Sequence, residues 1–201
     1  MIFDGQCNWL KFTIFSRKIR AKRRRIQIKI PGLGSLTIAH IVMDNNGTLA
    51  CDGKLLAGGA ELPKSLNEAV YFHVVTADTF GVAQKQLRGL PCTLTILPPE
   101  DQDIGKLEYI RKFREQQTLR IGNGRNDALM IEHAALGIAV IQAEGAYAQT
   151  VLNSDVVCRT IYEALELSRN PDRLQATLRT FNEHHSCPNC NIGASDRRKR
   201  L

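Results

Sequence analysis

The chain contains residues whose side chains suit the transfer of a phosphoryl group. A carboxylate on a glycine-containing turn is placed to attack phosphorus, and Asp44 lies on such a turn beside Gly47. The backbone N–H groups of the turn can cradle phosphate oxygens. A hydroxyl group from Thr76 and the ammonium group of Lys106 can share the remaining negative charge. These residue types predict phosphoryl transfer with Asp44 as the nucleophile.

Attack of a carboxylate on a phosphate brings two anions together and therefore requires a cation between them. Magnesium prefers oxygen ligands and neutralises charge on the phosphoryl group. Carboxylate and amide oxygens are present both on this turn and in the segment 122–127. The predicted ligands of a magnesium ion are Asp44, a backbone carbonyl near Asn46, Asn123 and Asp127.

The elements that must position these residues can be located from hydrophobic spacing. Residues 26–38 alternate between apolar and polar around a Pro-Gly-Leu-Gly turn, which predicts an N-terminal β-hairpin. Short apolar segments then alternate with stretches of helical spacing such as 104–113. This order indicates an α/β fold with a Rossmann-like parallel sheet and helices on both faces. The predicted strands are 38–43, 71–75, 93–97, 119–121, 137–141 and 155–158.

Polar residues terminate several of these predicted strands. Asp44 follows the first strand, Thr76 the second, and Asn123 and Asp127 the fourth, whereas Lys106 comes after the third. Because the carboxyl ends of parallel strands meet at one edge of the sheet, we expect these side chains to converge there.

With these motifs in place, the sequence resembles the haloacid dehalogenase superfamily, and more closely its branch of soluble P-type-ATPase-like proteins. The P-type pumps carry D-K-T-G-T, T-G-D and G-D-G-x-N-D. This chain has D-N-N-G-T at 44–48, T-A-D at 76–78 and G-N-G-R-N-D at 122–127, and the similarity covers about residues 26–170.

The resemblance implies a role for each matching residue. Asp44 would be phosphorylated, Thr76 and Lys106 would bind phosphate, Asp127 would be an acid of the metal site, and Asn126 would contact the phosphate. The expected catalytic residues are thus Asp44, Asn46, Thr76 and Lys106, and the expected phosphate-binding residues are Asn45, Gly47, Thr76, Ala77, Lys106 and Asn126.

Two positions depart from the family pattern. Asn123 replaces the metal-binding aspartate of the pumps and leaves a neutral oxygen ligand. Asn46 stands where the phosphatases of the superfamily usually have a general acid. The intervals between the motifs are too short for the nucleotide domain of the pumps or for a lid, so the sequence indicates a cap-less phosphohydrolase, a phosphatase or a slow soluble ATPase, that acts on a phosphorylated substrate.

The composition restricts the class of protein. The net charge is +7, but residues 26–180 hold 15 basic and 17 acidic residues, whereas the two ends hold 12 basic and 3 acidic residues. The basic character therefore belongs to the ends and gives no general nucleic-acid signal. The six cysteines are mostly scattered singly, no apolar run is long enough to span a bilayer, and a cytoplasmic location is expected.

The ends of the chain allow further interpretations. Residues 1–25 form a basic extension, residues 26–170 the phosphotransfer domain, and residues 171–201 a helix with a basic tail. His184, His185, Cys187 and Cys190 are chemically adequate zinc ligands, although a disordered tail is the favoured interpretation. Contact with a membrane or nucleic acid is possible but not favoured, and a homo-oligomer is possible. The alternative function is a phosphate-sensing or nucleic-acid-binding partner protein with weak catalysis.

Overall fold

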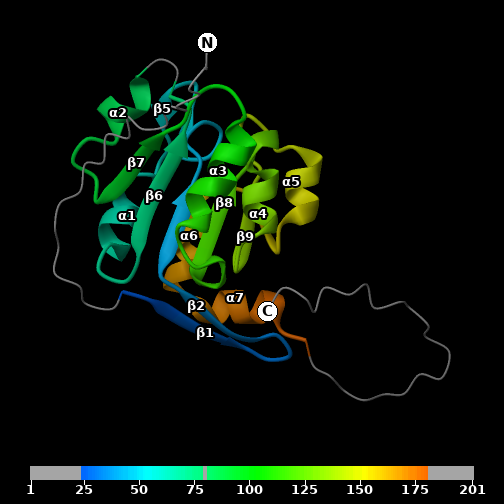
Figure 1. Ribbon diagram of the computed structural model, residues 1–201. Coiled ribbons are helices and arrows are strands. Elements are labelled where there is room, and N and C mark those ends of the chain that lie inside the picture. Colours follow the sequence, from blue (N-terminus) through cyan, green and yellow to red (C-terminus); the bar gives the residue numbers. More distant parts are fainter. Residues whose placement is uncertain (1–23, 79–80, 181–201) are drawn as a thin grey trace, which may run out of the picture.

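The structure is a computed structural model that describes residues 24–78 and 81–180 (Figure 1). Its centre is a six-stranded parallel sheet with the strand order β10-β9-β8-β3-β6-β7. The predicted parallel α/β architecture is confirmed. The strands are β3 (His40–Met43), β6 (Tyr71–Thr76), β7 (Cys92–Ile96), β8 (Thr118–Gly122), β9 (Leu136–Val140) and β10 (Val156–Cys158).

The N-terminal hairpin is also confirmed, and it consists of β1 (Ile26–Ile30) and β2 (Gly34–Ile38) in antiparallel pairing. The expected strand over 38–43 is wrong at its start, since β2 ends at Ile38 and β3 begins two residues later. Ala39 lies between them, where its N–H donates to the carbonyl of Gln117 and its carbonyl accepts from Tyr71 N–H. These two bonds anchor the chain at the point where it enters the central sheet.

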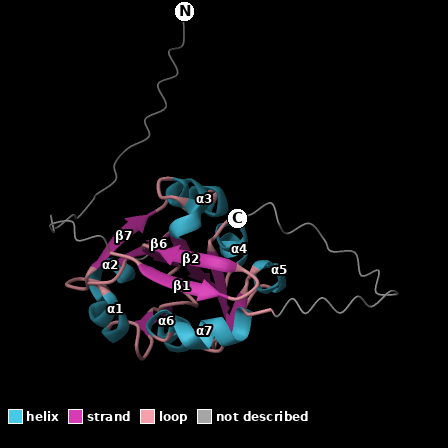
Figure 2. Ribbon diagram, turned by 90° about the horizontal axis from the view of Figure 1, so that it is seen from below, coloured by secondary structure: helices cyan, strands magenta, loops and turns pink. Residues whose placement is uncertain are grey.

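Helices cover both faces of the sheet (Figure 2). One face packs against α1, α2, α6 and α7, and the other against α3, α4 and α5. The bounds are α1 (Glu61–Leu66), α2 (Val82–Gln86), α3 (Gln102–Arg111), α4 (Ala128–Glu132), α5 (Ala148–Asn153), α6 (Ile161–Arg169) and α7 (Pro171–Leu178), with 3₁₀ turns η1 (Glu115–Gln117) and η2 (Arg125–Asp127).

Coverage of both faces explains the uninterrupted apolar character of the central strands. In β3, Ile41 and Met43 point into the cluster under α1 and α6, whereas Val42 points into the cluster under α3 and α4. All five residues of β9 are buried for the same reason. The central strands are thus packed on both faces, and this packing fixes the positions of the polar residues at their ends.

The hairpin and α7 close the amino-terminal end of the sheet, at the bottom of Figure 1. Leu174 of α7 is fully buried in the same core as the hairpin residues Ile28 and Ile30. Beyond the helix, Thr180 N–H donates to the carbonyl of Pro31. The helix α7, which follows residue 170, therefore packs on the same core as the hairpin.

Only small elements separate β3 from β6. They are the two-residue strands β4 (Ala50–Cys51) and β5 (Lys54–Leu55), which pair as a short hairpin, and helix α1. We call this short hairpin with its turn, residues 50–55, the flap. No separate domain is inserted at this point of the described chain, so the carboxyl edge of the sheet carries no cap.

None of the helices in residues 24–78 and 81–180 is long and apolar enough to span a membrane. Residues 1–23 of the basic extension expected over 1–25 lie outside the described residues, as do the four expected zinc ligands, His184, His185, Cys187 and Cys190. The interpretations attached to them stay predictions.

A pair of hydrogen-bonded histidines lies under α3, toward the amino-terminal end of the sheet. His40 Nδ1 and His73 Nε2 are 3.0 Å apart, and His73 Nδ1 is 3.0 Å from the hydroxyl of Tyr109. The ring of Phe113 packs against both imidazoles. Burial, together with the charge of His40, lowers the pKa of His73 from 6.5 to about 3. His73 is therefore neutral in the folded protein at all but acidic pH.

This depressed pKa makes stability dependent on pH. The unfolded chain binds a proton at His73 below pH 6.5, whereas the folded chain binds it only near pH 3, so acid favours unfolding between these values. We expect His73→Gln to remove a slope of about 1.4 kcal/mol per pH unit from the free energy of unfolding in this window. Urea unfolding between pH 4 and 7 measures it. The exposed His133→Gln is the control, and an equal loss of slope in that variant would contradict the assignment to His73.

Candidate active site

The structure brings three charged residues of the predicted site into direct contact. Lys106 Nζ lies 2.9 Å from Asp44 Oδ1 and 2.6 Å from Asp127 Oδ1. Asp44 follows β3, Asp127 ends η2 after the neighbouring strand β8, and Lys106 projects from α3. All three side chains are buried, with exposed fractions of 9% or less. A single ammonium group thus bridges two carboxylates that are distant in the sequence.

Burial controls the electrostatics of this triad. It raises the pKa of Asp44 to about 6, an effect to which the charge of Asp127 adds and which Lys106 opposes. Burial alone would lower the pKa of Lys106, but the two carboxylates outweigh it and the pKa is raised. We therefore treat Lys106 as the permanent cation of the triad and Asp44 as a carboxylate that Lys106 helps to keep ionised.

Asp127 uses both of its carboxylate oxygens within the protein. Oδ1 accepts from Lys106, and Oδ2 accepts from the backbone N–H groups of Asn123 and Gly124 at 3.0 and 2.9 Å. Gly122 leaves room for this arrangement, because a Cβ atom there would lie 2.5 Å from Asp127 Cγ. Asp127 therefore holds the loop after β8 and positions Lys106.

The turn after Asp44 is closed by its own backbone. The carbonyl of Asn45 accepts from the N–H groups of Thr48, Leu49 and Ala50, and Gly47 N–H donates to the carbonyl of Ala50. Gly47 has a φ of 72°, in the left-handed region that favours glycine. The turn therefore returns the chain directly into the flap.

Asn123 packs against this turn. A Cβ atom at Gly47 would lie 2.3 Å from Asn123 Nδ2, so only glycine fits there. The side-chain oxygen of Asn123 accepts from the Thr48 hydroxyl at 3.3 Å, and its Nδ2 donates to the carbonyl of Gly145 at 3.0 Å. Asn123 thus joins the turn to the loop 142–147.

Asn45 and Asn46 differ in exposure. Asn45 is buried, and its Nδ2 donates to Asn46 Oδ1 at 3.2 Å. Asn46 is exposed, so the position at which the family resemblance would place a general acid faces solvent.

Thr76 lies at the end of β6, the other neighbour of β3, and is buried. Its hydroxyl oxygen accepts from the N–H of Asp78 at 3.3 Å across Ala77, and the carboxylate of Asp78 accepts from the N–H groups of Ala83 and Gln84 in α2. This segment fixes the start of α2 next to the sheet.

Asn126 points elsewhere. Its Nδ2 donates to Gln102 Oε1 of α3 at 2.8 Å, so in this structure its amide links η2 to α3. The predicted contact between Asn126 and a phosphate stays a prediction.

The oxygen-rich donor set near Asp44 fits magnesium by its chemistry. The Asp44 carboxylate, the backbone carbonyl of Asn46, Asn123 Oδ1 and the Asp127 carboxylate are the predicted ligands, and their assignment to a metal stays a prediction. Lys106 offsets part of the charge of the two carboxylates, and Asn123 and the Asn46 carbonyl are neutral, which suits a weakly held ion completed by water and substrate.

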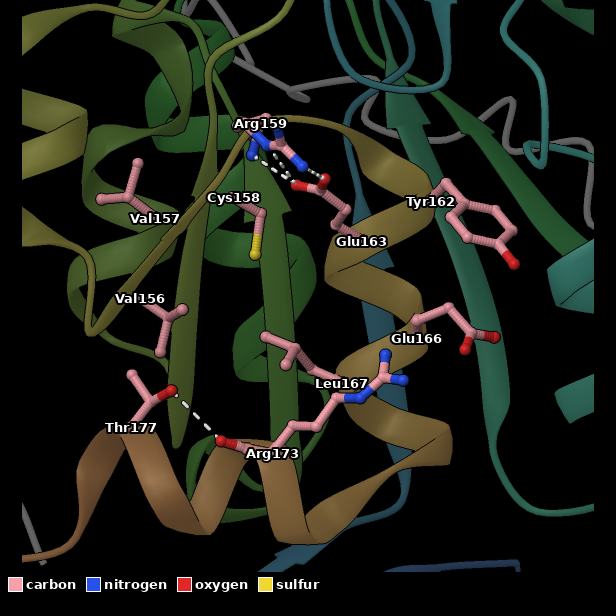
Figure 3. A pocket seen from close by; sticks show the side chains of 10 residues that line it. All are labelled: Val156, Val157, Cys158, Arg159, Tyr162, Glu163, Glu166, Leu167, Arg173 and Thr177. Carbon is pink, nitrogen blue, oxygen red and sulfur yellow. Dashed lines mark hydrogen bonds and ion pairs between the residues drawn. The ribbon is translucent and has the colours of Figure 1, made fainter.

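Two pockets lie on the α6 side of the described body, and neither contains a member of the predicted site. One, of about 360 Å³, runs between β10, α6 and α7 (Figure 3). Its rim carries an ion pair between Arg159 and Glu163. The other, of about 570 Å³, is lined mainly by apolar groups, and Gln142 and Tyr162 contribute to it. The triad is instead a compact, buried cluster at the sheet edge.

The sequence interpretation missed Gln142. Its Nε2 donates to the carbonyls of Gly47 and Thr48, both at 2.8 Å, and its Oε1 accepts from Ile161 N–H at 2.8 Å. A glutamine after a strand carries no motif, so only the three-dimensional arrangement reveals these bonds.

Comparison with known proteins places the chain among relatives. No protein-family model matches it. The uncharacterized protein MJ0073 of Methanocaldococcus jannaschii is 42% identical over 82 residues, which are 39% of this chain and 88% of that protein. The chain belongs to the family of MJ0073.

Solved structures identify the fold of this MJ0073 relative. A Legionella pneumophila structure described as a subfamily III A hydrolase of the haloacid dehalogenase superfamily aligns with a TM-score of 0.56 and 16% identity, over 70% of this chain and 87% of that one. The cobalt-bound 3-deoxy-D-manno-octulosonate 8-phosphate phosphatase of Haemophilus influenzae aligns with 0.56 and 14%, over 71% and 94%.

The corresponding phosphatase of Moraxella catarrhalis, solved with magnesium, phosphate and the KDO molecule, aligns with a TM-score of 0.52 and 19% identity over the same shares. The fold of this member of the MJ0073 family is therefore that of the haloacid dehalogenase superfamily, without a cap domain, and it is similar to metal-dependent phosphatases.

Proposed function

We propose that the protein is a magnesium-dependent phosphohydrolase that acts through an aspartyl phosphate on Asp44. The observation that carries this proposal is the bridge that Lys106 makes between Asp44 and Asp127 at the carboxyl ends of adjacent strands. The motifs at 44–48, 76–78 and 122–127 favour the soluble P-type-ATPase-like branch within the superfamily.

In the first step, a carboxylate oxygen of Asp44 forms a bond to phosphorus while the bond between phosphorus and the leaving oxygen breaks. The electron pair of that bond departs with the leaving group. Lys106 carries the positive charge nearest to Asp44 among the described residues and offsets charge that accumulates on the phosphoryl oxygens. The Thr76 hydroxyl is a further donor in this proposal, whereas the N–H groups of Gly47, Thr48, Leu49 and Ala50 donate to carbonyls within the turn.

In the second step, a water oxygen forms a bond to phosphorus and the bond to Asp44 breaks. Inorganic phosphate is released, the carboxylate is regenerated, and the proton of water passes to solvent. Asn46 can hydrogen-bond to this water but cannot accept its proton. We therefore infer that the phosphorylated protein is long-lived, which is also what a phosphate-sensing partner protein would require.

A magnesium ion supplies charge neutralisation and polarisation of the phosphoryl group. Asp44, the carbonyl of Asn46, Asn123 and Asp127 would hold it, and Asp127 would also position Lys106. The absence of a cap leaves this edge of the sheet open, so the substrate is a phosphorylated compound whose size the protein does not restrict there.

A screen of phosphate donors tests the proposed function. Acetyl phosphate, p-nitrophenyl phosphate, ATP and sugar phosphates would each be incubated with the full-length protein and magnesium, with release of phosphate and labelling of the protein measured. We expect turnover of at least one acyl or aryl phosphate that EDTA abolishes. If no donor is turned over and none labels the protein, the proposal is refuted.

The exposed Asn46 provides a sharper test of the mechanism. Proton transfer by a positioned side chain typically contributes 10² to 10⁴ in rate, and Asn46 cannot supply it. We expect Asn46→Asp to raise turnover of alkyl phosphates such as sugar phosphates by on the order of 10-fold or more. Turnover of acetyl phosphate should rise by much less, because its leaving group, acetate, departs without protonation. The lifetime of the phosphorylated protein on a gel should shorten in the same variant. Equal gains for both classes of donor would contradict this account.

A further inference from the structure

Gln142 connects three segments that are far apart in the sequence. Its Nε2 donates to the carbonyls of Gly47 and Thr48 in the turn after Asp44, and its Oε1 accepts from Ile161 N–H at the start of α6. Each of these distances is 2.8 Å. The two ends of the amide thus have different partners, a pair of acceptors at the nitrogen and one donor at the oxygen, which fixes the orientation of the side chain.

These hydrogen bonds fix the orientation of the peptide groups in the turn. A peptide unit is planar, so holding the carbonyl of Gly47 also holds the N–H of Thr48, and holding the carbonyl of Thr48 holds the N–H of Leu49. Both N–H groups donate to the carbonyl of Asn45, the residue that follows Asp44. Gln142 therefore stabilises, from outside, the backbone that leads away from the candidate nucleophile.

The loop that begins with Gln142 contacts the same region a second time. Gly145 accepts from Asn123 Nδ2, and Tyr147 N–H donates to the carbonyl of Asn123. Between Gln142 and Gly145, Glu144 lies beside Cys51 of the flap. The turn, the loop after β8 and the flap are in this way tied to one segment, residues 142–147.

We propose that Gln142 is a positioning residue that holds the turn carrying Asp44 in the geometry required for phosphoryl transfer. The proposal rests on the proposed function for its catalytic part and on the three hydrogen bonds for its structural part. Gln142 is only half-buried and borders the 570 Å³ pocket, so a change of this side chain does not disturb the core.

Gln142→Glu is the most informative variant, because it keeps the shape of the side chain and replaces the donor with a carboxylate oxygen. Two carbonyl oxygens would then face a negative charge. We expect hydrogen exchange of the backbone amides in 44–50, followed by mass spectrometry, to accelerate about 10-fold or more, as for the loss of two hydrogen bonds. Exchange in β8 should stay unchanged and serves as the internal reference.

Turnover adds the catalytic readout. We expect kcat of Gln142→Glu to fall about 10-fold or more with KM within about twofold, and Gln142→Ala to fall less, because it removes the donor without adding repulsion. Gln149→Ala is the matched control, since this glutamine lies on α5, is exposed, and bonds only to Asn153. It should change neither exchange of 44–50 nor kcat.

The two readouts separate the possible failures. Unchanged exchange of 44–50 in Gln142→Glu overturns the role of Gln142, whether or not the wild-type protein has activity. Faster exchange with an unchanged kcat also overturns it, because the turn would then not require this support for catalysis. A wild-type protein that neither turns over nor accepts label from any donor overturns the proposed function, and the exchange experiment still decides whether Gln142 holds the turn.

Discussion

Asp44→Asn is expected to reduce both turnover and labelling of the protein to background. The amide has the shape of the carboxyl group but cannot form the acyl phosphate, so the covalent route is lost rather than slowed. The fold should persist, because Lys106 keeps its 2.6 Å contact with Asp127 in this variant. Phosphate release and acid-stable labelling on gels measure the effect, and thermal unfolding verifies the fold.

A matched exchange of an exposed aspartate controls for the loss of charge alone. Asp172 lies in the first turn of α7, and α7 closes the amino-terminal end of the sheet. Asp172→Asn should retain full activity. If Asp44→Asn retained more than a few per cent of wild-type turnover, the nucleophile would have to be another residue.

Lys106→Met should have the second-largest effect, and it should reduce activity and stability together. The variant leaves Asp44 and Asp127 buried without their shared cation, and removing one partner of a buried ion pair typically costs about 3–5 kcal/mol. Because Lys106 lowers the pKa of Asp44, loss of the ammonium group should raise this pKa and favour the protonated carboxyl group, which is a poor nucleophile. We expect a rate lower by on the order of 10²-fold or more.

A double variant separates the two consequences of this change. In Lys106→Met with Asp127→Asn, only one carboxylate remains in the buried cluster, so part of the lost free energy of unfolding should return. Activity should not return, because no cation replaces Lys106. Lys85→Met on the exposed side of α2 is the control for removal of a positive charge. Wild-type stability of Lys106→Met would show that the triad is not the buried ion cluster described above.

The sheet could be predicted from sequence because its strands have one dominant requirement, burial on both faces. Strands such as β8 and β9 consist of residues that are all buried, and the hydrophobic pattern locates them to within one residue or two. The break between β2 and β3 at Ala39 could not be predicted from the sequence, since residues 36–43 are similarly apolar on either side of it. Hydrogen bonds to Gln117 and Tyr71, both distant in sequence, decide where β3 begins.

The candidate site could be predicted as a set of residues but not in its internal connections. Polar groups at strand ends are visible in the sequence, and the structure brings Asp44, Lys106 and Asp127 together. The sequence does not show that Asp127 accepts hydrogen bonds from the backbone amides of Asn123 and Gly124. The pairing of Asn126 with Gln102 and the three bonds of Gln142 likewise depend on distances that no spacing rule contains.

The order of the strands has a consequence for the synthesis of the protein. The strand that leads to Asp44 lies between β6, which ends at Thr76, and β8, which ends at Gly122. A ribosome delivers the chain from its amino end, so one side of β3 lacks its neighbour until β8 has emerged. Until then the nascent chain presents an unpaired apolar edge, and Asp44 lacks both β8 and Asp127. We therefore expect the nascent protein to depend on protection from aggregation during this interval.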